Sequence, residues 1–148
     1  MGWLKSLKNK LLIARQLSLR DWLALAEAWW VLLSFYLALH WASYERLETS
    51  NRLVPAKAAD PARALEIAHR LQRPVELAAR LHLFSMTCLV RAFALRRMLH
   101  RRGIPATLRL GAYKSLAEIQ AHAWVEVEGQ AIGEGEDTID RFKVLSSK

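Results

Sequence analysis

The sequence predicts an α+β protein, in which a helical first half precedes one further helix and a small antiparallel sheet. Apolar residues recur at helical spacing through residues 3–44, whereas Ala106–Ala112 and Ala121–Val127 alternate as strands do. The 148 residues, 53% of them hydrophobic, suffice for one buried core and exclude a disordered chain. We expect a helical region over residues 1–60, made of core or docking helices, and a second unit over residues 61–148.

The N-terminal region is basic and then strongly apolar. Residues 3–20 space their apolar side chains as an amphipathic helix does, with lysines between them. We expect Asp21 to cap a long helix from Trp22 to Tyr44. Its uninterrupted apolar run, residues 28–39, has 12 residues, fewer than the roughly 18 that a bilayer requires. We therefore interpret this helix as core or as a docking helix, with a peripheral membrane contact through the basic start as the alternative.

The second half begins at Asp60, which caps a helix that starts with Pro61. We expect this helix to end near Leu71, with a break before Pro74 and a short helix to His82. Ser85 or Thr87 then caps a helix over residues 88–102, and Gly103 ends it. The two alternating strands follow, and after a turn signal at residues 128–129 a third strand is expected over residues 130–134.

Charge is unevenly distributed along the chain. The net charge is +8, yet residues 118–140 contain seven acids and no lysine or arginine. A nucleic-acid stripe does not normally lie beside such an acidic stretch, so we predict no nucleic-acid partner. We expect the arginines of the helix over residues 88–102 to form a solvated face: Arg91, Arg96, Arg97, Arg101 and Arg102.

Cys88 and His122 are the candidate catalytic pair. Cys88 is the only cysteine, so the chain forms no internal disulfide and suits a reducing, cytoplasmic compartment. It falls in the first turn of its helix, where the helix dipole favours a thiolate. His122 falls on the strand face opposite to an apolar alternation, where an imidazole can accept the thiol proton. Alternatively, Cys88 is a small core residue and His122 a surface histidine.

A third residue should orient the imidazole, and the hairpin register decides which acid does so. A two-residue turn at residues 128–129 places Asp137 on the face of His122. A three-residue loop places Glu134 there instead. Sequence spacing alone leaves both open.

The stretch from Cys88 to Gly103, followed by Leu108–Gly111 and by Ala-His-Ala-Trp-Val-Glu at residues 121–126, resembles the transglutaminase-like leader peptidases of lasso-peptide biosynthesis. The resemblance covers about residues 85–140. It implies a transglutaminase- or papain-like fold over residues 61–148, and a cysteine peptidase that cleaves the leader from a precursor peptide without a cofactor or metal. By position it favours Glu134 as the third member, where the family usually has an aspartate, with Asp137 as the alternative.

The resemblance also implies partners. They are the leader region of the precursor, a separate leader-recognition protein and an ATP-dependent lasso cyclase. We find no sequence that resembles a leader-recognition domain in this chain. The competing hypothesis is a catalytically silent module on the same scaffold, whose basic helices bind a partner protein or a membrane.

Overall fold

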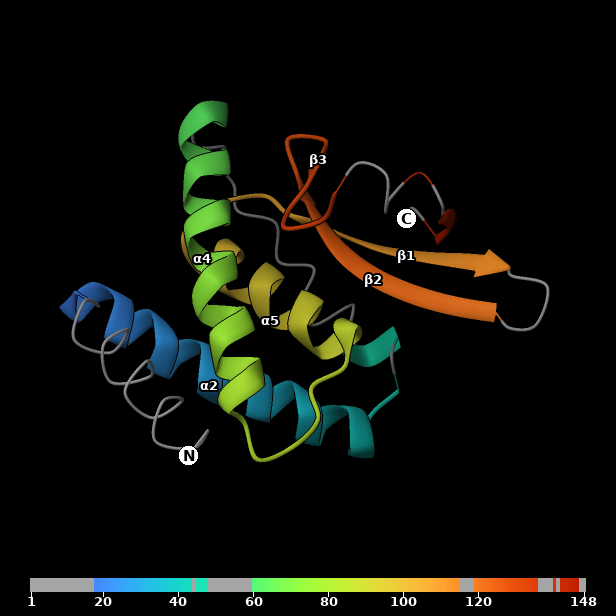
Figure 1. The fold of residues 1–148 in the computed structure, drawn as a ribbon, viewed down its shortest axis with the longest axis horizontal. Coiled ribbons are helices and arrows are strands. Elements are labelled where there is room, and N and C mark those ends of the chain that lie inside the picture. The colour runs from blue at the N-terminus through green and yellow to red at the C-terminus, as the bar shows by residue number, and fades with distance from the viewer. Residues whose placement is uncertain are drawn as a thin grey trace, which may run out of the picture.

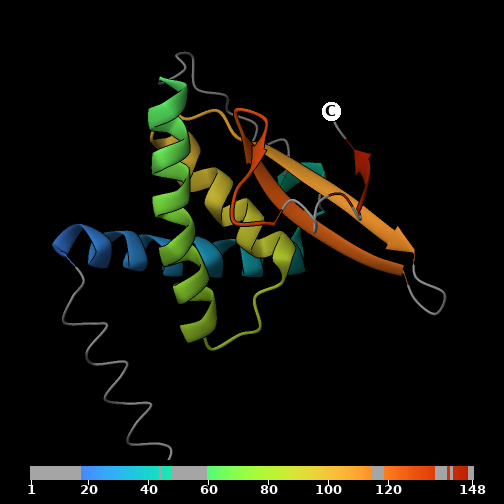
Figure 2. The same ribbon diagram turned by 45° about the horizontal axis from the view of Figure 1, so that its top comes forward.

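The computed structural model describes residues 18–43, 45–47, 60–114, 119–135, 140 and 142–146. The helices are α2 (Leu19–Trp41), α4 (Pro61–Leu81) and α5 (Cys88–Arg101), and the strands are β1 (Thr107–Lys114), β2 (Ile119–Val127), β3 (Gln130–Ala131) and β4 (Lys143–Ser146). The antiparallel sheet has the order β3-β2-β1-β4. α5 contacts α2, α4, β1 and β2, with the sheet to one side of the helices (Figures 1 and 2). The α+β prediction is confirmed.

The helix α2 starts earlier than expected. Its cap is Ser18, whose hydroxyl accepts from the backbone N–H of Asp21, while the Asp21 carboxylate accepts from the Ser18 backbone N–H at 2.9 Å. The prediction that Asp21 itself is the cap is wrong, because Asp21 completes a capping box from the third helical position. Most of the basic segment at residues 3–20, and Tyr44, lie outside the described residues.

One face of α2 lies in the core. Ala28, Val31 and Leu32 are buried in the same apolar cluster as residues of α4, α5 and the sheet. The division of the chain at residue 60 stays a prediction, but α2 shares the core of the second half. In the described part of the chain, α2 is also the one helix that is long and apolar enough to cross a membrane.

The helix α4 continues through Pro74, which corrects the expected break at this position. Pro74 removes one backbone donor, at a cost of about 3 kcal/mol in a helix interior. The buried stripe of α4 runs on both sides of it, with Ala64, Ala68 and Leu71 before and Val75 and Ala78 after. Burial of this continuous stripe offsets the lost hydrogen bond, so the helix does not end.

The helix α5 ends as the sequence predicts. Gly103, with φ +74°, donates to the His100 carbonyl, and Ile104 donates to the Leu99 carbonyl. This pair of bonds is a Schellman motif, in which glycine takes the left-handed conformation without strain.

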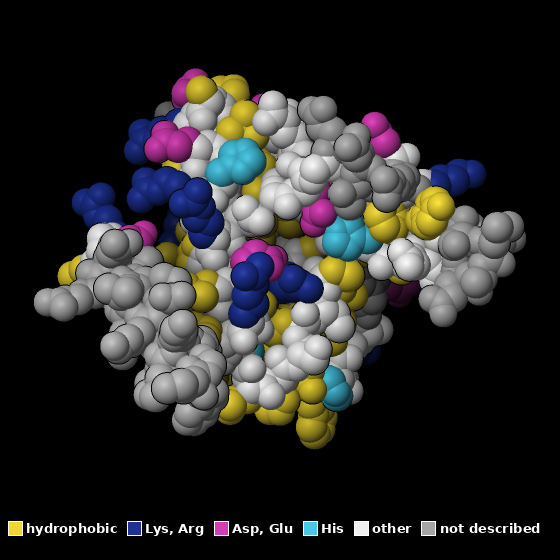
Figure 3. All heavy atoms as spheres, viewed as in Figure 1, with side chains coloured by type: hydrophobic (Ala, Val, Ile, Leu, Met, Phe, Trp, Pro, Cys, Tyr) yellow, Lys and Arg dark blue, Asp and Glu magenta, His cyan; other side chains and the backbone are white. Residues whose placement is uncertain are grey.

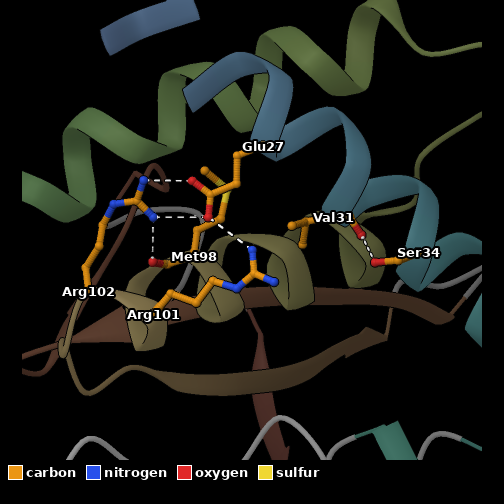
Figure 4. A network of polar contacts seen from close by, with 6 residues as sticks. All are labelled: Glu27, Val31, Ser34, Met98, Arg101 and Arg102. Carbon is orange, nitrogen blue, oxygen red and sulfur yellow. Dashed lines mark hydrogen bonds and ion pairs between the residues drawn. The ribbon is translucent and has the colours of Figure 1, made fainter. Parts of the chain in front are cut away.

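The arginines of α5 form a solvated face only in part: Arg101 and Arg102 are exposed, whereas Arg96 is buried, which corrects the prediction for Arg96. Arg96 is only 6% exposed, and its Nε donates to the Ala106 carbonyl at 3.1 Å. Arg101 and Arg102 both pair with Glu27 of α2, Arg102 with two bonds of 2.7 and 3.3 Å (Figure 4). Because α5 packs against α2, Arg101 and Arg102 thus form ion pairs that link the two helices.

Glu27 is ionised more readily than an ordinary glutamate. Burial raises the pKa of its carboxyl, but the hydrogen bond and charge of Arg102, and then those of Arg101, outweigh burial. The net result is a pKa below the ordinary value of 4.5.

The hairpin of β2 and β3 has a two-residue turn. Val127 pairs with Gln130, and the two turn residues Glu128 and Gly129 both have positive φ, 51° and 78°. The third strand is shorter than expected, because the ladder ends at Ala131. The strand β4, which the sequence analysis did not predict, pairs with β1 at the other edge.

Candidate active site

Cys88 is the first residue of α5. The Thr87 hydroxyl accepts from the Val90 backbone N–H at 3.4 Å and caps the helix, so of the two predicted caps the structure has Thr87. The cysteine is half-buried. Its sulfur therefore lies at the positive end of the helix dipole while remaining accessible, which is the setting of a nucleophilic thiol.

The segment before this helix, residues 82–87, is held against α2 by aromatic stacking; we call it the cysteine loop. Trp29 stacks on His82 with ring centroids 4.6 Å apart and planes inclined by 22°. Tyr36 stacks on Phe84 at 4.8 Å and 14°. The position of Cys88 therefore depends on α2 as well as on α5.

His122 lies on β2 among aromatic rings. Its ring centroid is 5.4 Å from that of Phe142 and 6.1 Å from that of Trp124. Trp124 is fully buried and donates its indole N–H to Glu126, whose other oxygen accepts from Arg109 at 2.8 Å. These rings restrict the rotation of the imidazole and keep one of its faces from water.

Gly111 makes room for this cluster. It is the β1 residue paired with His122. A Cβ at this position would lie 2.7 Å from the Phe142 Cβ and 2.8 Å from the Trp124 ring, both closer than real Cβ contacts. Only glycine lets the two rings pack against the strand beside the histidine.

Glu134 is the acid that contacts His122. Its Oε1 lies 3.0 Å from Nε2 of the imidazole, and both side chains are about one quarter exposed. Nε2 makes no well-aligned hydrogen bond within the described residues. A small rotation of the ring would align this contact, as is common for catalytic pairs without substrate.

The route by which Glu134 reaches His122 corrects the register argument. We expected that Glu134 would require a loop longer than two residues, and this is wrong because the turn has two. Regular pairing ends with the bond from the Ile132 N–H to the Val125 carbonyl. Gly133 then takes φ +79° and redirects the chain, so strand parity no longer decides which face Glu134 occupies. Asp137 lies outside the described residues.

Cys88, His122 and Glu134 line one cavity of about 280 Å³ between α4, α5 and β2. Histidine, acidic and basic side chains surround a hollow on this face of the molecule (Figure 3). The wall from α4 contains Gln72, Glu76 and Arg80, which sequence reasoning missed although their spacing places them on one helix face. Glu76 pairs with Arg91 of α5 at 3.0 Å and ties the two helices beside the cavity.

The arrangement can perform acyl transfer. A cysteine at a helix start, a histidine and a carboxylate that orients its far ring nitrogen are the elements of a Cys–His–acid site. Because Glu134 contacts Nε2, Nδ1 is the nitrogen left to exchange a proton with Cys88.

The chain is similar to known proteins over part or most of its length. The Microcin J25-processing protein McjB of Escherichia coli is 35% identical over 66 residues, which are 45% of this chain and 31% of that protein. The chain thus matches less than one third of the length of that relative, and no solved structure matches the chain. The sequence profile of the Transglutaminase-like superfamily matches residues 29–147, from within α2 to beyond β4. The chain belongs to the transglutaminase-like superfamily.

Proposed function

We propose that the chain is a cysteine peptidase that cleaves the leader from a lasso-peptide precursor. The observation that carries the proposal is the common cavity of Cys88, His122 and Glu134, with the acid 3.0 Å from the imidazole. The substrate class is supported by the similarity to McjB, which is named for processing microcin J25, a lasso peptide.

The reaction proceeds by nucleophilic catalysis. Nδ1 of His122 takes the thiol proton, and the Cys88 sulfur attacks the carbonyl carbon of the scissile peptide bond. The imidazolium then protonates the leaving amine, which is the N-terminus of the core peptide, and the leader remains as a thioester on Cys88. Water, deprotonated by His122, hydrolyses the thioester and frees the leader carboxylate. Glu134 stabilises the imidazolium in both halves of the reaction.

The negative oxygen that forms in each tetrahedral intermediate needs hydrogen-bond donors. The backbone N–H of Cys88 is one such donor, because the first N–H groups of a helix have no partner within the helix. We propose that a separate protein recognises the leader, that an ATP-dependent cyclase uses the freed amine, and that all of this takes place in the cytoplasm.

The test is cleavage of a candidate precursor, followed by mass spectrometry, with a leader-recognition protein present. Cys88→Ser and His122→Asn should each abolish cleavage, while Arg97→Gln on the same helix as Cys88 should leave it intact. Alkylation of Cys88 by iodoacetamide should be slower in His122→Asn than in the wild type. Undiminished cleavage by Cys88→Ser would exclude the peptidase. Binding of the precursor without cleavage by the wild type would instead favour the silent module.

A further inference from the structure

The outward face of α2 carries an apolar stripe that no described element covers. Its large members are well exposed, Trp30 at 64% and Trp41 at 87%. At 100° per residue the stripe occupies a sector of about 100°, with Trp22 at its border. We call this set the outer stripe: Leu19, Trp22, Leu23, Ala26, Trp30, Leu37 and Trp41.

Polar groups along the outer stripe are satisfied within the helix. The Ser34 hydroxyl donates to the Val31 carbonyl at 2.7 Å (Figure 4), and Nδ1 of His40 lies 2.9 Å from the Tyr36 carbonyl. Glu27, at the border of the stripe, is neutralised by two arginines. If this face moved from water into apolar surroundings, Ser34, His40 and Glu27 would therefore keep their hydrogen-bond or ion-pair partners.

The two borders of the stripe differ in character. On one border lie three cations, Arg20, Arg101 and Arg102, and the carboxylate of Glu27, which pairs with the last two. The other border adjoins the cysteine loop, which exposes Leu83 and Phe84. One face of the molecule thus presents tryptophans and leucines with arginines beside them.

We propose that this face binds the surface of an anionic lipid bilayer, with α2 lying in the plane of the interface. Tryptophan rings favour the headgroup region of a bilayer, and arginines at the border attract anionic headgroups. The net charge of +8 acts in the same direction. A spanning orientation would remove Ala28, Val31 and Leu32 of α2 from the core in which they are buried, which favours the interfacial orientation.

Co-sedimentation of the full chain with vesicles tests the proposal. Vesicles of phosphatidylethanolamine with a minor share of phosphatidylglycerol should pellet the protein, whereas phosphatidylcholine vesicles should pellet much less of it, and added salt should weaken binding. The double variant Trp30→Ser/Trp41→Ser should lower the partition coefficient about tenfold or more. Ile119→Ser removes a comparably exposed apolar side chain from the sheet, and it should bind as the wild type does.

Far-ultraviolet circular dichroism checks that each variant is folded. Equal partition of the wild type and of the folded double variant would overturn the proposal, and so would failure of the wild type to bind anionic vesicles. If the wild type binds no vesicles and is dimeric, and the double variant is monomeric, the outer stripe is an interface between copies of the chain and the lipid proposal is wrong.

Discussion

Gly133→Ala is the substitution that best tests how the site is built. Gly133 has φ +79°, and a Cβ on it would overlap the side-chain amide of Gln72 on α4. Two costs therefore combine. The left-handed backbone costs an alanine about 1–2 kcal/mol relative to glycine, and Gln72 must also leave its place beside the bend that carries Glu134.

Gly129 supplies a matched control. Its φ is +78°, almost equal to that of Gly133, but a Cβ there would meet nothing within 4 Å. Gly129→Ala should therefore cost about 1–2 kcal/mol of unfolding free energy from the backbone alone. Gly133→Ala should lower the free energy of unfolding further, because Gln72 must also move. Of the two variants, only Gly133→Ala should lower the turnover number, because the bend and Glu134 shift relative to His122.

The assays are urea unfolding for stability and precursor cleavage for turnover. In the double variant Gln72→Ala/Gly133→Ala, the alanine at position 72 removes the overlap. The free energy of unfolding of the double variant should therefore be lower than that of Gln72→Ala by the same amount that Gly129→Ala loses relative to the wild type. Equal losses of stability and activity in Gly133→Ala and Gly129→Ala would refute the reasoning, since the contact with Gln72 would then have no effect on the bend.

Three further predictions concern single side chains. Glu134→Gln should lower turnover by roughly 100- to 10,000-fold with little loss of stability, while Asp137→Asn should leave most activity; the reverse result in a cleavage assay would assign the orienting role to Asp137. Ionised Glu27 stabilises the fold fully above about pH 4.5 and loses this effect as the pH falls through its lowered pKa. Urea unfolding between roughly pH 3 and 6 should therefore show a shallower acid loss in Glu27→Gln, and identical slopes would contradict the pairing. Trp29→Ala should slow cleavage about tenfold by loosening the cysteine loop, and Trp29→Phe should restore most of it. Trp41→Ala, which removes an exposed ring without any stacking partner in the described residues, should cleave normally in the absence of lipid.

Local signals in the sequence predicted much of this protein. The capping threonine before Cys88 and the left-handed Gly103 each depend on a few neighbouring residues, and the structure has both. Such features are determined by backbone hydrogen bonds and conformational preferences, which act over one or two turns. The alternation around His122 predicts the strand, but burial does not alternate along it, because Ala123, Trp124 and Val125 are all buried.

Features that depend on contacts distant in sequence could not be predicted in this way. Arg96 looks like a surface residue until β1 brings the Ala106 carbonyl to it, and Pro74 looks like a helix end until the buried stripe of α4 is known. Glu134 was favoured by family position, whereas strand parity favoured Asp137 for a two-residue turn. Parity does not exclude Glu134, because it assumes a regular strand, and Gly133 ends that regularity two residues after the last pair of the β2–β3 ladder.

The single cysteine of the sequence is the nucleophile of the proposed reaction, and this role would make the site sensitive to oxidation. A thiolate that is reactive toward a carbonyl is also reactive toward peroxide, which converts it to a sulfenic acid. With no second cysteine in the chain, that acid cannot be trapped as an internal disulfide and reduced later. It must meet an external thiol before further oxidation makes the loss permanent. The partial burial of Cys88 would slow the approach of an oxidant and the approach of a rescuing thiol alike, so it would affect both damage and repair.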